Sequence, residues 1–344
     1  MTGRGGIWPE RRRDRRPCGL AGVLVAALLL AAAAAPESGL AAGSGKIFVS
    51  NEKSSTITVL DGTTAQEIKS FETCARPRGM VFSKDRTRFY VGCADDDQIA
   101  VYDVASLELV ERFRDIEEPE TFDLHPDGRH LYISNEEDAA ATVLDLETGE
   151  IVGEAEIGEE PEGVLVTPDG ATVYVASEAA NLVHVIDTAT MEVTADILVG
   201  TRPRRFALTP DGKELWVSAE LAGRVDIVDT ARNKLAASID FLPRGFRRNE
   251  VTPVDLLMTR DGKTAFVALG RANHVAVVDV AVRRVEDYIL VGKRPWGLAL
   301  TRDQKTLYVA NGLSDDLSII DTATRKVVKS VPAGLIPYGI LIDD

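Results

Sequence analysis

Seven copies of one short pattern run along this chain at a nearly constant spacing. Each copy holds an apolar segment that ends in an aspartate, and a proline opens the unit that follows. Both markers recur every 42 residues, except at one interval of 50 residues where they shift together. The aspartates are Asp61, Asp103, Asp145, Asp187, Asp229, Asp279 and Asp321. The prolines are Pro77, Pro119, Pro161, Pro203, Pro253, Pro295 and Pro337. Repeats of about 40 residues built from short apolar segments are typical of β-propeller blades.

Each repeat reads as four short strands, which we name a to d from the central channel outward. In the fourth repeat we expect them over residues 163–167, 172–177, 182–187 and 192–199. Short strands with alternating apolar residues suit sheets that pack against neighbours on both faces. The Pro-Asp-Gly turn at 168–170 suits the connection of strands a and b, because proline fixes φ and glycine permits positive φ.

The two ends of the repeat region predict how the ring closes. The repeats begin with a strand b at residues 46–50 and end with a lone strand a at residues 339–343. The C-terminal strand therefore completes the N-terminal blade, which leaves no strand edge open. We predict an all-β, seven-bladed propeller of four-stranded blades, forming a single domain over residues 43–344.

Residues 1–42 read as a signal peptide followed by a short linker. Six arginines precede an uninterrupted apolar run of 16 residues, and small residues follow it. Such a run is short for a membrane span and suits the apolar region of a secretory signal. We expect cleavage near Ala41 and a periplasmic or secreted protein, with an uncleaved anchor as the alternative.

The net charge excludes two classes of partner. The chain carries a formal net charge of −15 at pH 7. An acidic surface is unsuited to nucleic acid or to an anionic membrane. No segment after residue 42 is long and apolar enough to predict a membrane span.

Cys74 and Cys93 remain in the chain after the predicted signal. By repeat register, Cys74 precedes strand a of the second blade and Cys93 ends strand b of that blade. Because these strands are antiparallel, both cysteines are expected at the same rim. An even pair in an oxidising compartment favours a disulfide. Two buried free thiols are the alternative.

The residue after each opening proline is expected to face the mouth of the channel. This position differs from blade to blade, whereas the framework repeats. Round the ring it holds Arg78, Glu120, Glu162, Arg204, Val254, Trp296 and Tyr338. Glu136, from a loop between strands b and c, is expected on the same face. We predict that this charged face binds a ligand or a partner, with ordinary solvated loops as the alternative.

The eight extra residues of the long interval fall in the loop before the sixth blade. This loop holds Phe246 and Arg247, which belong to residue types enriched in interface hot spots. We predict that they contribute to the binding face. The alternative is that the loop packs down as a lid on its own propeller.

Catalytic and metal-binding motifs are sparse. By register, none of the four histidines shares a rim with a serine or cysteine nucleophile, which argues against a catalytic triad. No cysteine–histidine pattern has the spacing of a zinc site. We therefore assign no catalytic residue, no metal ligand and no cofactor. Paired glutamates such as Glu120 and Glu162 offer the alternative of a hard-cation site or an acid–base pair.

The repeats resemble the YVTN family of β-propellers, in which Tyr-Val-x-Asn closes strand b and Ile-Asp-Thr follows strand c. The matching segments are Tyr308-Val309-Ala310-Asn311 and Ile186-Asp187-Thr188. Within that family the chain is similar to the PQQ-dependent catabolism-associated β-propeller proteins. The segments that carry this likeness include Arg76-Pro77-Arg78-Gly79, Leu124-His125-Pro126-Asp127-Gly128 and Glu160-Pro161-Glu162-Gly163. The resemblance implies an exported accessory of quinoprotein alcohol oxidation. We do not expect this chain to bind the quinone, because it has seven predicted blades, three tryptophans and no adjacent pair of cysteines.

These observations lead us to expect a non-enzymatic binding module in the periplasm. The expected partner is a quinoprotein dehydrogenase or its cytochrome, or else a small polar ligand. The alternative is a propeller enzyme of the lactonase type that uses the mouth carboxylates, with or without a metal ion.

Overall fold

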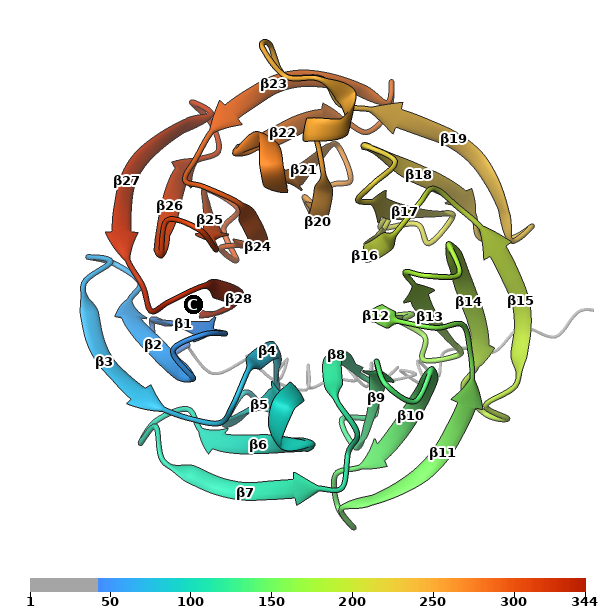
Figure 1. Cartoon of the computed structure of the whole chain (residues 1–344). Coiled ribbons are helices and arrows are strands. Elements are labelled where there is room, and N and C mark those ends of the chain that lie inside the picture. The colour runs from blue at the N-terminus through green and yellow to red at the C-terminus, as the bar shows by residue number, and fades with distance from the viewer. Residues whose placement is uncertain (1–42) are drawn as a thin grey trace, which may run out of the picture. The chain divides into compact units, whose positions relative to one another are not determined.

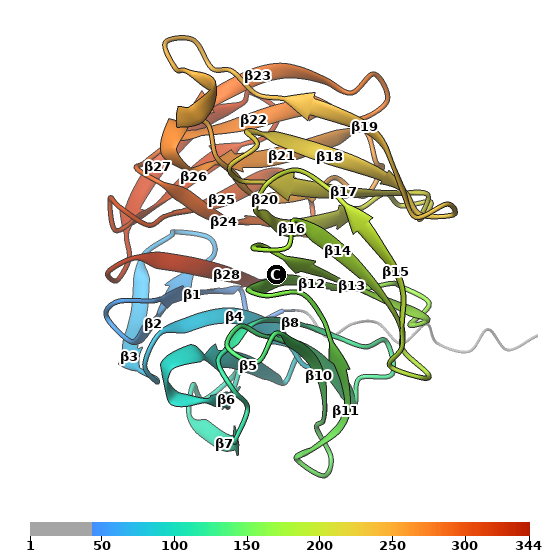
Figure 2. The same ribbon diagram turned by 45° about the vertical axis from the view of Figure 1, so that its right-hand side comes forward.

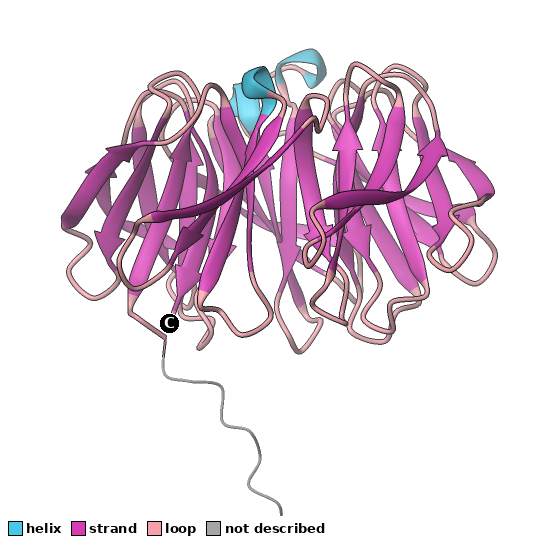
Figure 3. Cartoon of the chain, turned by 90° about the horizontal axis from the view of Figure 1, so that it is seen from below, coloured by secondary structure: helices cyan, strands magenta, loops and turns pink. Residues whose placement is uncertain are grey.

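The computed structural model describes residues 43–344, which form a ring of seven four-stranded blades (Figure 1). In every blade strand a lies innermost and strand d lies at the rim. The predicted all-β, seven-bladed propeller is therefore confirmed. Three short 3-10 helices lie on one face of the ring (Figure 3): η1 (Ala94–Asp96), η2 (Arg248–Glu250) and η3 (Gly270–Ala272).

Each blade runs from its innermost strand outward to the rim. The first blade holds β28 (Pro337–Asp343), β1 (Lys46–Asn51), β2 (Thr56–Asp61) and β3 (Glu67–Glu72). The second holds β4 (Pro77–Phe82), β5 (Arg88–Cys93), β6 (Gln98–Asp103) and β7 (Leu109–Arg114). The third holds β8 (Pro119–Leu124), β9 (His130–Asn135), β10 (Ala140–Asp145) and β11 (Glu150–Glu156). The fourth holds β12 (Pro161–Val166), β13 (Thr172–Ser177), β14 (Leu182–Asp187) and β15 (Val193–Leu198).

The other three blades follow the same order. The fifth holds β16 (Pro203–Leu208), β17 (Glu214–Ala219), β18 (Arg224–Asp229) and β19 (Lys234–Asp240). The sixth holds β20 (Pro253–Met258), β21 (Thr264–Leu269), β22 (His274–Asp279) and β23 (Arg284–Leu290). The seventh holds β24 (Pro295–Leu300), β25 (Thr306–Asn311), β26 (Asp316–Asp321) and β27 (Lys326–Pro332).

The C-terminal strand closes the ring. β28 lies beside β1 (Figure 2) and pairs antiparallel with it. Lys46 lies opposite Asp343 in this pairing. Arg86 of the second blade binds the same end, with its Nε 2.9 Å from Asp343 Oδ1. The C-terminal strand thus completes the first blade, as the ends of the repeat region predict.

Each inner strand starts at its proline, two residues before the predicted start. In the fourth blade Pro161 lies opposite Ser177, but regular pairing with strand b resumes only at Val164. Glu162 and Gly163 therefore have no partner in the ladder. The same register shift occurs in all seven blades. Such β-bulges redirect side chains and often lie beside functional sites.

Apolar side chains of strands b and c hold neighbouring blades together. In the fifth blade Trp216 is fully buried, in a cluster with Val225, Phe241 and Leu256 that reaches into the sixth blade. Truncating a buried aromatic residue of this size to alanine typically costs about 3–5 kcal/mol. The strands that carry the channel side chains are therefore held in place by tightly packed cores between the blades.

Cys74 and Cys93 form a disulfide in the second blade, with a Cα–Cα distance of 5.6 Å. Both residues are buried. The bond joins the loop before β4 to the end of β5. It therefore holds in place the start of β4, the inner strand that carries Arg78.

The predicted signal peptide falls on residues 1–42 and lies outside the described residues. Its boundary with the propeller stays a prediction. Among residues 43–344, no helix is both long and apolar enough to cross a membrane.

Candidate functional site

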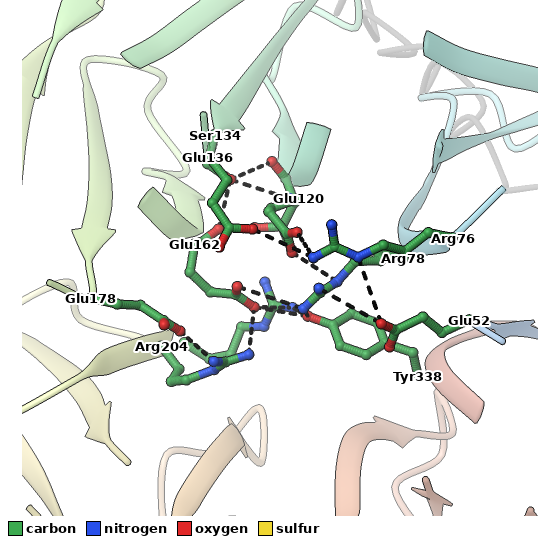
Figure 4. Close-up of polar contacts among 12 residues, drawn as sticks. Glu52, Arg76, Arg78, Glu120, Ser134, Glu136, Glu162, Glu178, Arg204 and Tyr338 are labelled. Atoms are coloured by element: carbon green, nitrogen blue, oxygen red, sulfur yellow. Dashed lines mark hydrogen bonds and ion pairs between the residues drawn. The ribbon is translucent and has the colours of Figure 1, made fainter. Parts of the chain in front are cut away.

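The bulges at the starts of the inner strands bring five of the seven predicted mouth residues together: Arg78, Glu120, Glu162, Arg204 and Tyr338 (Figure 4). Arg78 Nη2 lies 3.7 Å and Arg204 Nη2 lies 3.0 Å from the Glu162 carboxylate. The Tyr338 hydroxyl donates to Glu162 Oε1 at 2.8 Å and accepts from Arg78 Nη2 at 3.1 Å. All four side chains are buried. Together with Glu120 they form a group that we call the ionic layer.

Glu120 forms the acidic side of the ionic layer. Its carboxylate lies 2.7 Å from Arg78 Nε and 2.6 Å from Arg76 Nη2. Arg76 also pairs with Glu118 and lies 3.5 Å from Glu136. Carboxylate oxygens of these three glutamates lie within 4.8 Å of one another. The Arg76 guanidinium contacts all three and supplies the positive charge that a metal ion would bring to this cluster.

The two buried glutamates of the layer have opposite pKa shifts. Burial and the neighbouring Glu162 charge raise the pKa of Glu120 to about 10, against the effect of Arg78 and Arg76. Burial would also raise the pKa of Glu162, but Arg204, Arg78 and Arg205 together hold it well below its usual range. At neutral pH one carboxyl is therefore protonated and the other ionised. Paired carboxyls with separated pKa values are typical of acid–base sites.

Trp296 lies on the arginine-rich side of the channel. The guanidinium carbons of Arg204 and Arg294 lie 4.9 and 4.7 Å from its ring centre, within cation–π range. The ring centre of Tyr338 is 5.8 Å away. Trp296 therefore packs against Arg204 of the fifth blade, Tyr338 of the first blade and Arg294 of the loop that precedes its own strand.

A cavity of about 170 Å³ adjoins the ionic layer and is lined by Arg205, Asp255, Trp296 and Tyr338, among others. A cavity of about 150 Å³ is large enough for a single six-membered ring. Arg205 Nη2 donates to the Tyr338 hydroxyl and lies 3.2 Å from Glu162 Oε1. The cavity is thus connected to the ionic layer through one guanidinium.

Asp255 supplies the carboxylate of this cavity. Its Oδ2 accepts the N–H of Leu298 at 2.7 Å, and its Oδ1 accepts the N–H of Leu256 at 2.9 Å. Burial raises the pKa of Asp255 to about 6, and the charge of Arg205 opposes that rise. A carboxylate with a pKa near the working pH suits a general base.

Arg205 and Asp255 were not among the site residues predicted from the sequence, because only one mouth residue per blade was expected. Both occupy the third position of the inner strand, which is glycine in four of the seven blades. Glycine recurs there because neighbouring inner strands are very close: a Cβ on Gly163 would lie 1.9 Å from the Arg204 carbonyl oxygen. A departure from glycine in this column is the signal that would have identified both residues.

The structure does not bring Phe246 and Arg247 to the ionic layer. Phe246 packs against the apolar cluster of the fifth and sixth blades, with its ring centre 5.6 Å from that of His274. Arg247 is exposed, and its backbone N–H donates to Glu250 Oε2 at 2.8 Å. In this arrangement the insertion packs on its own propeller.

By register no histidine was expected to share a rim with a serine nucleophile, but His184 contacts Ser177. Its Nε2 lies 2.8 Å from Ser177 Oγ, and its Nδ1 lies 2.6 Å from Asp196 Oδ1. Diagonal neighbours in the β13–β14 hairpin bring the serine and histidine together. Ser177 is fully buried, and its hydroxyl also donates to the Gly158 carbonyl. Asn311 and Ser318 occupy the equivalent positions in the seventh blade, so this arrangement belongs to the blade framework.

Two family models match parts of the chain. The model described as "Lactonase, 7-bladed beta-propeller" matches residues 187–331, and the model described as "YNCE-like beta-propeller" matches residues 85–211. Each match spans less than half of the chain. No protein of curated function matches it.

Solved structures with this fold include enzymes of several kinds. The chain is similar to the periplasmic gluconolactonase PpgL of Pseudomonas aeruginosa (20% identity, 87% of this chain and 99% of that one, TM-score 0.74). It is also similar to a candidate 6-phosphogluconolactonase of Bacteroides fragilis (17% identity, 88% of this chain and 99% of that one, TM-score 0.72). A third similar structure is the hydrazine synthase of Kuenenia stuttgartiensis (22% identity, 76% of this chain and 88% of that one, TM-score 0.68). At these identities the likeness shows the fold alone.

The predicted non-enzymatic module accessory to PQQ-dependent oxidation is contradicted. The family model matched over residues 187–331 is that of lactonases, and neither matched model is that of the YVTN family or its PQQ-associated branch. These findings support the alternative that the sequence left open, a propeller enzyme of the lactonase type. The binding-module prediction gave too little weight to the channel, because the cavity beside the mouth residues cannot be seen in the sequence.

Proposed function

We propose that this protein is a lactonase-type hydrolase that opens a small lactone in its central channel. The observation that carries the proposal is that Arg205 and Asp255 line the same cavity of about 170 Å³. A fixed cation and a carboxylate with a pKa of about 6 supply the two functions that ester hydrolysis requires. The lactonase match over residues 187–331, which includes both residues, supports this reading.

The reaction follows from the roles of these two side chains. Asp255 takes a proton from a water molecule, which attacks the carbonyl carbon of the lactone. The Arg205 guanidinium stabilises the negative charge on the carbonyl oxygen in the tetrahedral intermediate. When the ring C–O bond breaks, the protonated Asp255 returns its proton to the leaving oxygen, and the product is a hydroxy acid.

The ionic layer positions the catalytic arginine. Glu162 Oε1 accepts from Tyr338 at 2.8 Å and lies 3.2 Å from Arg205 Nη2. Burial raises the pKa of Tyr338 to about 12, so its hydroxyl stays protonated. We assign Glu162 and Tyr338 as positioning residues because they hold the guanidinium in one orientation before substrate binds.

The place of action that we propose is the periplasm. The signal-like N-terminus, the disulfide between Cys74 and Cys93, and the likeness to a periplasmic gluconolactonase support it. The small polar ligand expected from sequence is then the lactone itself. A quinoprotein or cytochrome partner stays a prediction, as does the finer resemblance to the YVTN family.

The direct test is acid release from a panel of five- and six-membered aldonolactones, followed at constant pH with the full chain. We expect turnover above the spontaneous rate, and a loss of about 100-fold or more in kcat/KM for Arg205→Met, as for removal of an oxyanion donor. Arg302→Met is the matched control, because this arginine lies in the β24–β25 turn away from the cavity lining. Rates equal to the spontaneous rate for every lactone would contradict the proposal.

A further inference from the structure

The turn between β8 and β9 gathers two imidazoles and a carboxylate at the end of the blade opposite the channel mouth. His125 Nδ1 lies 2.9 Å and His130 Nδ1 lies 2.7 Å from the same atom, Asp127 Oδ2. The three ligand atoms lie within 4.8 Å of one another. The imidazoles are partly exposed and Asp127 is exposed, so the cluster is accessible from solvent.

Backbone groups fix the orientation of these side chains. Asp127 Oδ1 accepts the N–H groups of Arg129 at 2.7 Å and His130 at 3.1 Å, which leaves Oδ2 for the two rings. His125 Nε2 lies 3.0 Å from the carbonyl oxygen of Gly170. Because a carbonyl only accepts, Nε2 carries the proton, and the Nδ1 of a neutral ring presents a lone pair. That lone pair also accepts the Asp127 N–H in a long contact of 3.2 Å.

Two lone-pair atoms at 2.9 Å repel each other unless a positive charge lies between them. A proton on the imidazole is one such charge, and a metal ion is the other. A neutral His130 can carry its one ring proton on Nδ1 and donate it to Asp127 Oδ2, so the contact that needs an added charge is that of His125. A metal ion supplies that charge and takes the His130 nitrogen and the carboxylate as further ligands.

The other a–b turns show that the fold does not need these histidines. In five other blades a hydroxyl replaces the His125 imidazole and bonds to the turn aspartate at 2.6–2.8 Å. These hydroxyl residues are Ser83, Thr167, Thr209, Thr259 and Thr301. The residues at the position of His130 are Arg88, Thr172, Glu214, Thr264 and Thr306. None of these five turns has histidine at either position, whereas the β8–β9 turn has histidine at both.

We propose that His125, Asp127 and His130 bind a divalent transition-metal ion, with Zn²⁺ as the best fit. Two imidazole nitrogens and one carboxylate oxygen are a usual zinc donor set, and a ring N–H held by a backbone carbonyl is the usual outer contact of a zinc-bound histidine. The three residues line a groove of about 560 Å³ with Glu154 and Thr188, so a fourth coordination position of the metal ion would face open space. The site does not depend on the proposed lactonase activity.

Calorimetric titration of the chelator-treated, untagged full chain with Zn²⁺ at pH 7.5 tests the proposal. We expect one equivalent to bind, with affinity falling at least 100-fold in the double variant His125→Thr, His130→Thr. Threonine is the residue of the equivalent turn in the fourth blade, and circular dichroism and the unfolding midpoint without metal check that the variant folds. Asp169→Asn, in that equivalent turn, is the control and should bind as the unaltered chain does. No uptake by the unaltered chain, or equal uptake by the double variant, would overturn the site.

Discussion

Arg205 of the fifth blade donates a hydrogen bond to the hydroxyl of Tyr338 of the first blade. The two residues lie 133 positions apart in the chain and meet because β16 and β28 both line the channel. The same guanidinium lies 3.2 Å from Glu162 Oε1, so three blades hold one cation in place. A charge fixed in this way can stabilise a developing oxyanion with little reorganisation.

Replacing Glu162 should destabilise the protein. Glu162→Gln removes the carboxylate that pairs with Arg204 at 3.0 Å and Arg78 at 3.7 Å, so two buried cations lose a counter-charge. Removing one member of a buried ion pair typically costs about 3–5 kcal/mol of unfolding free energy. Urea unfolding at pH 7 measures this loss, with Glu120→Gln as the matched control. An equal loss in both variants would contradict the opposite pKa shifts of the two glutamates.

Glu120 should make stability fall as the pH rises. Burial raises its pKa in the folded state to about 10, above the value of 4.5 expected in the unfolded chain. Between these values the folded state binds more protons than the unfolded state, so the unfolding free energy decreases with rising pH. In Glu120→Gln this contribution disappears. Urea unfolding at pH 5.5, 7 and 8.5 should show the unaltered chain losing stability relative to the variant, and parallel curves would refute the shift.

Ser177→Ala should lower stability without lowering turnover. The hydroxyl lies 2.8 Å from His184 Nε2 but is fully buried within the blade. Losing a buried hydrogen bond of this kind typically costs about 1–3 kcal/mol. We expect an unchanged kcat/KM for lactone hydrolysis and an earlier urea midpoint. Loss of turnover in a folded variant would instead make this serine part of the catalytic machinery.

Removing the disulfide should weaken the second blade. Cys74 and Cys93 are 19 positions apart, and closing a loop of about this length contributes about 3 kcal/mol in the chain-entropy model. Cys74→Ala combined with Cys93→Ala should therefore lower the unfolding free energy by a similar amount. Addition of a reductant should lower the stability of the unaltered chain and leave the double variant unaffected.

The repeat pattern was sufficient to predict the fold. Seven copies of the repeat predicted seven blades. The strand that closes the ring was predicted from the strand b at residues 46–50 and the lone strand a at 339–343. In the fourth blade the expected bounds of strands b and c agree with β13 and β14. The start of strand a was misplaced because its proline pairs in the ladder before a bulge.

The same bulge explains how much of the site the sequence could reveal. A regular strand alternates its side chains between two faces, so one channel-facing residue was expected at the start of each inner strand. The bulge brings the next position to the channel as well, which places Arg205 and Asp255 beside the cavity. The placement of Phe246 depends on how a loop packs, and no repeat pattern specifies it.

The measurement that tests the central claim most directly is the pH dependence of lactone hydrolysis by the unaltered chain, Asp255→Asn and Asp123→Asn. Asp123 is the matched control: it accepts the same two kinds of backbone N–H, and burial also raises its pKa to about 6, but it does not line the cavity. For the unaltered chain and Asp123→Asn we predict kcat/KM that falls as the pH drops through about 6, because Asp255 becomes protonated. Asp255→Asn should lose about 100-fold or more, as for a general base. Full turnover in Asp255→Asn, with the same pH profile, would contradict the proposed role of Asp255.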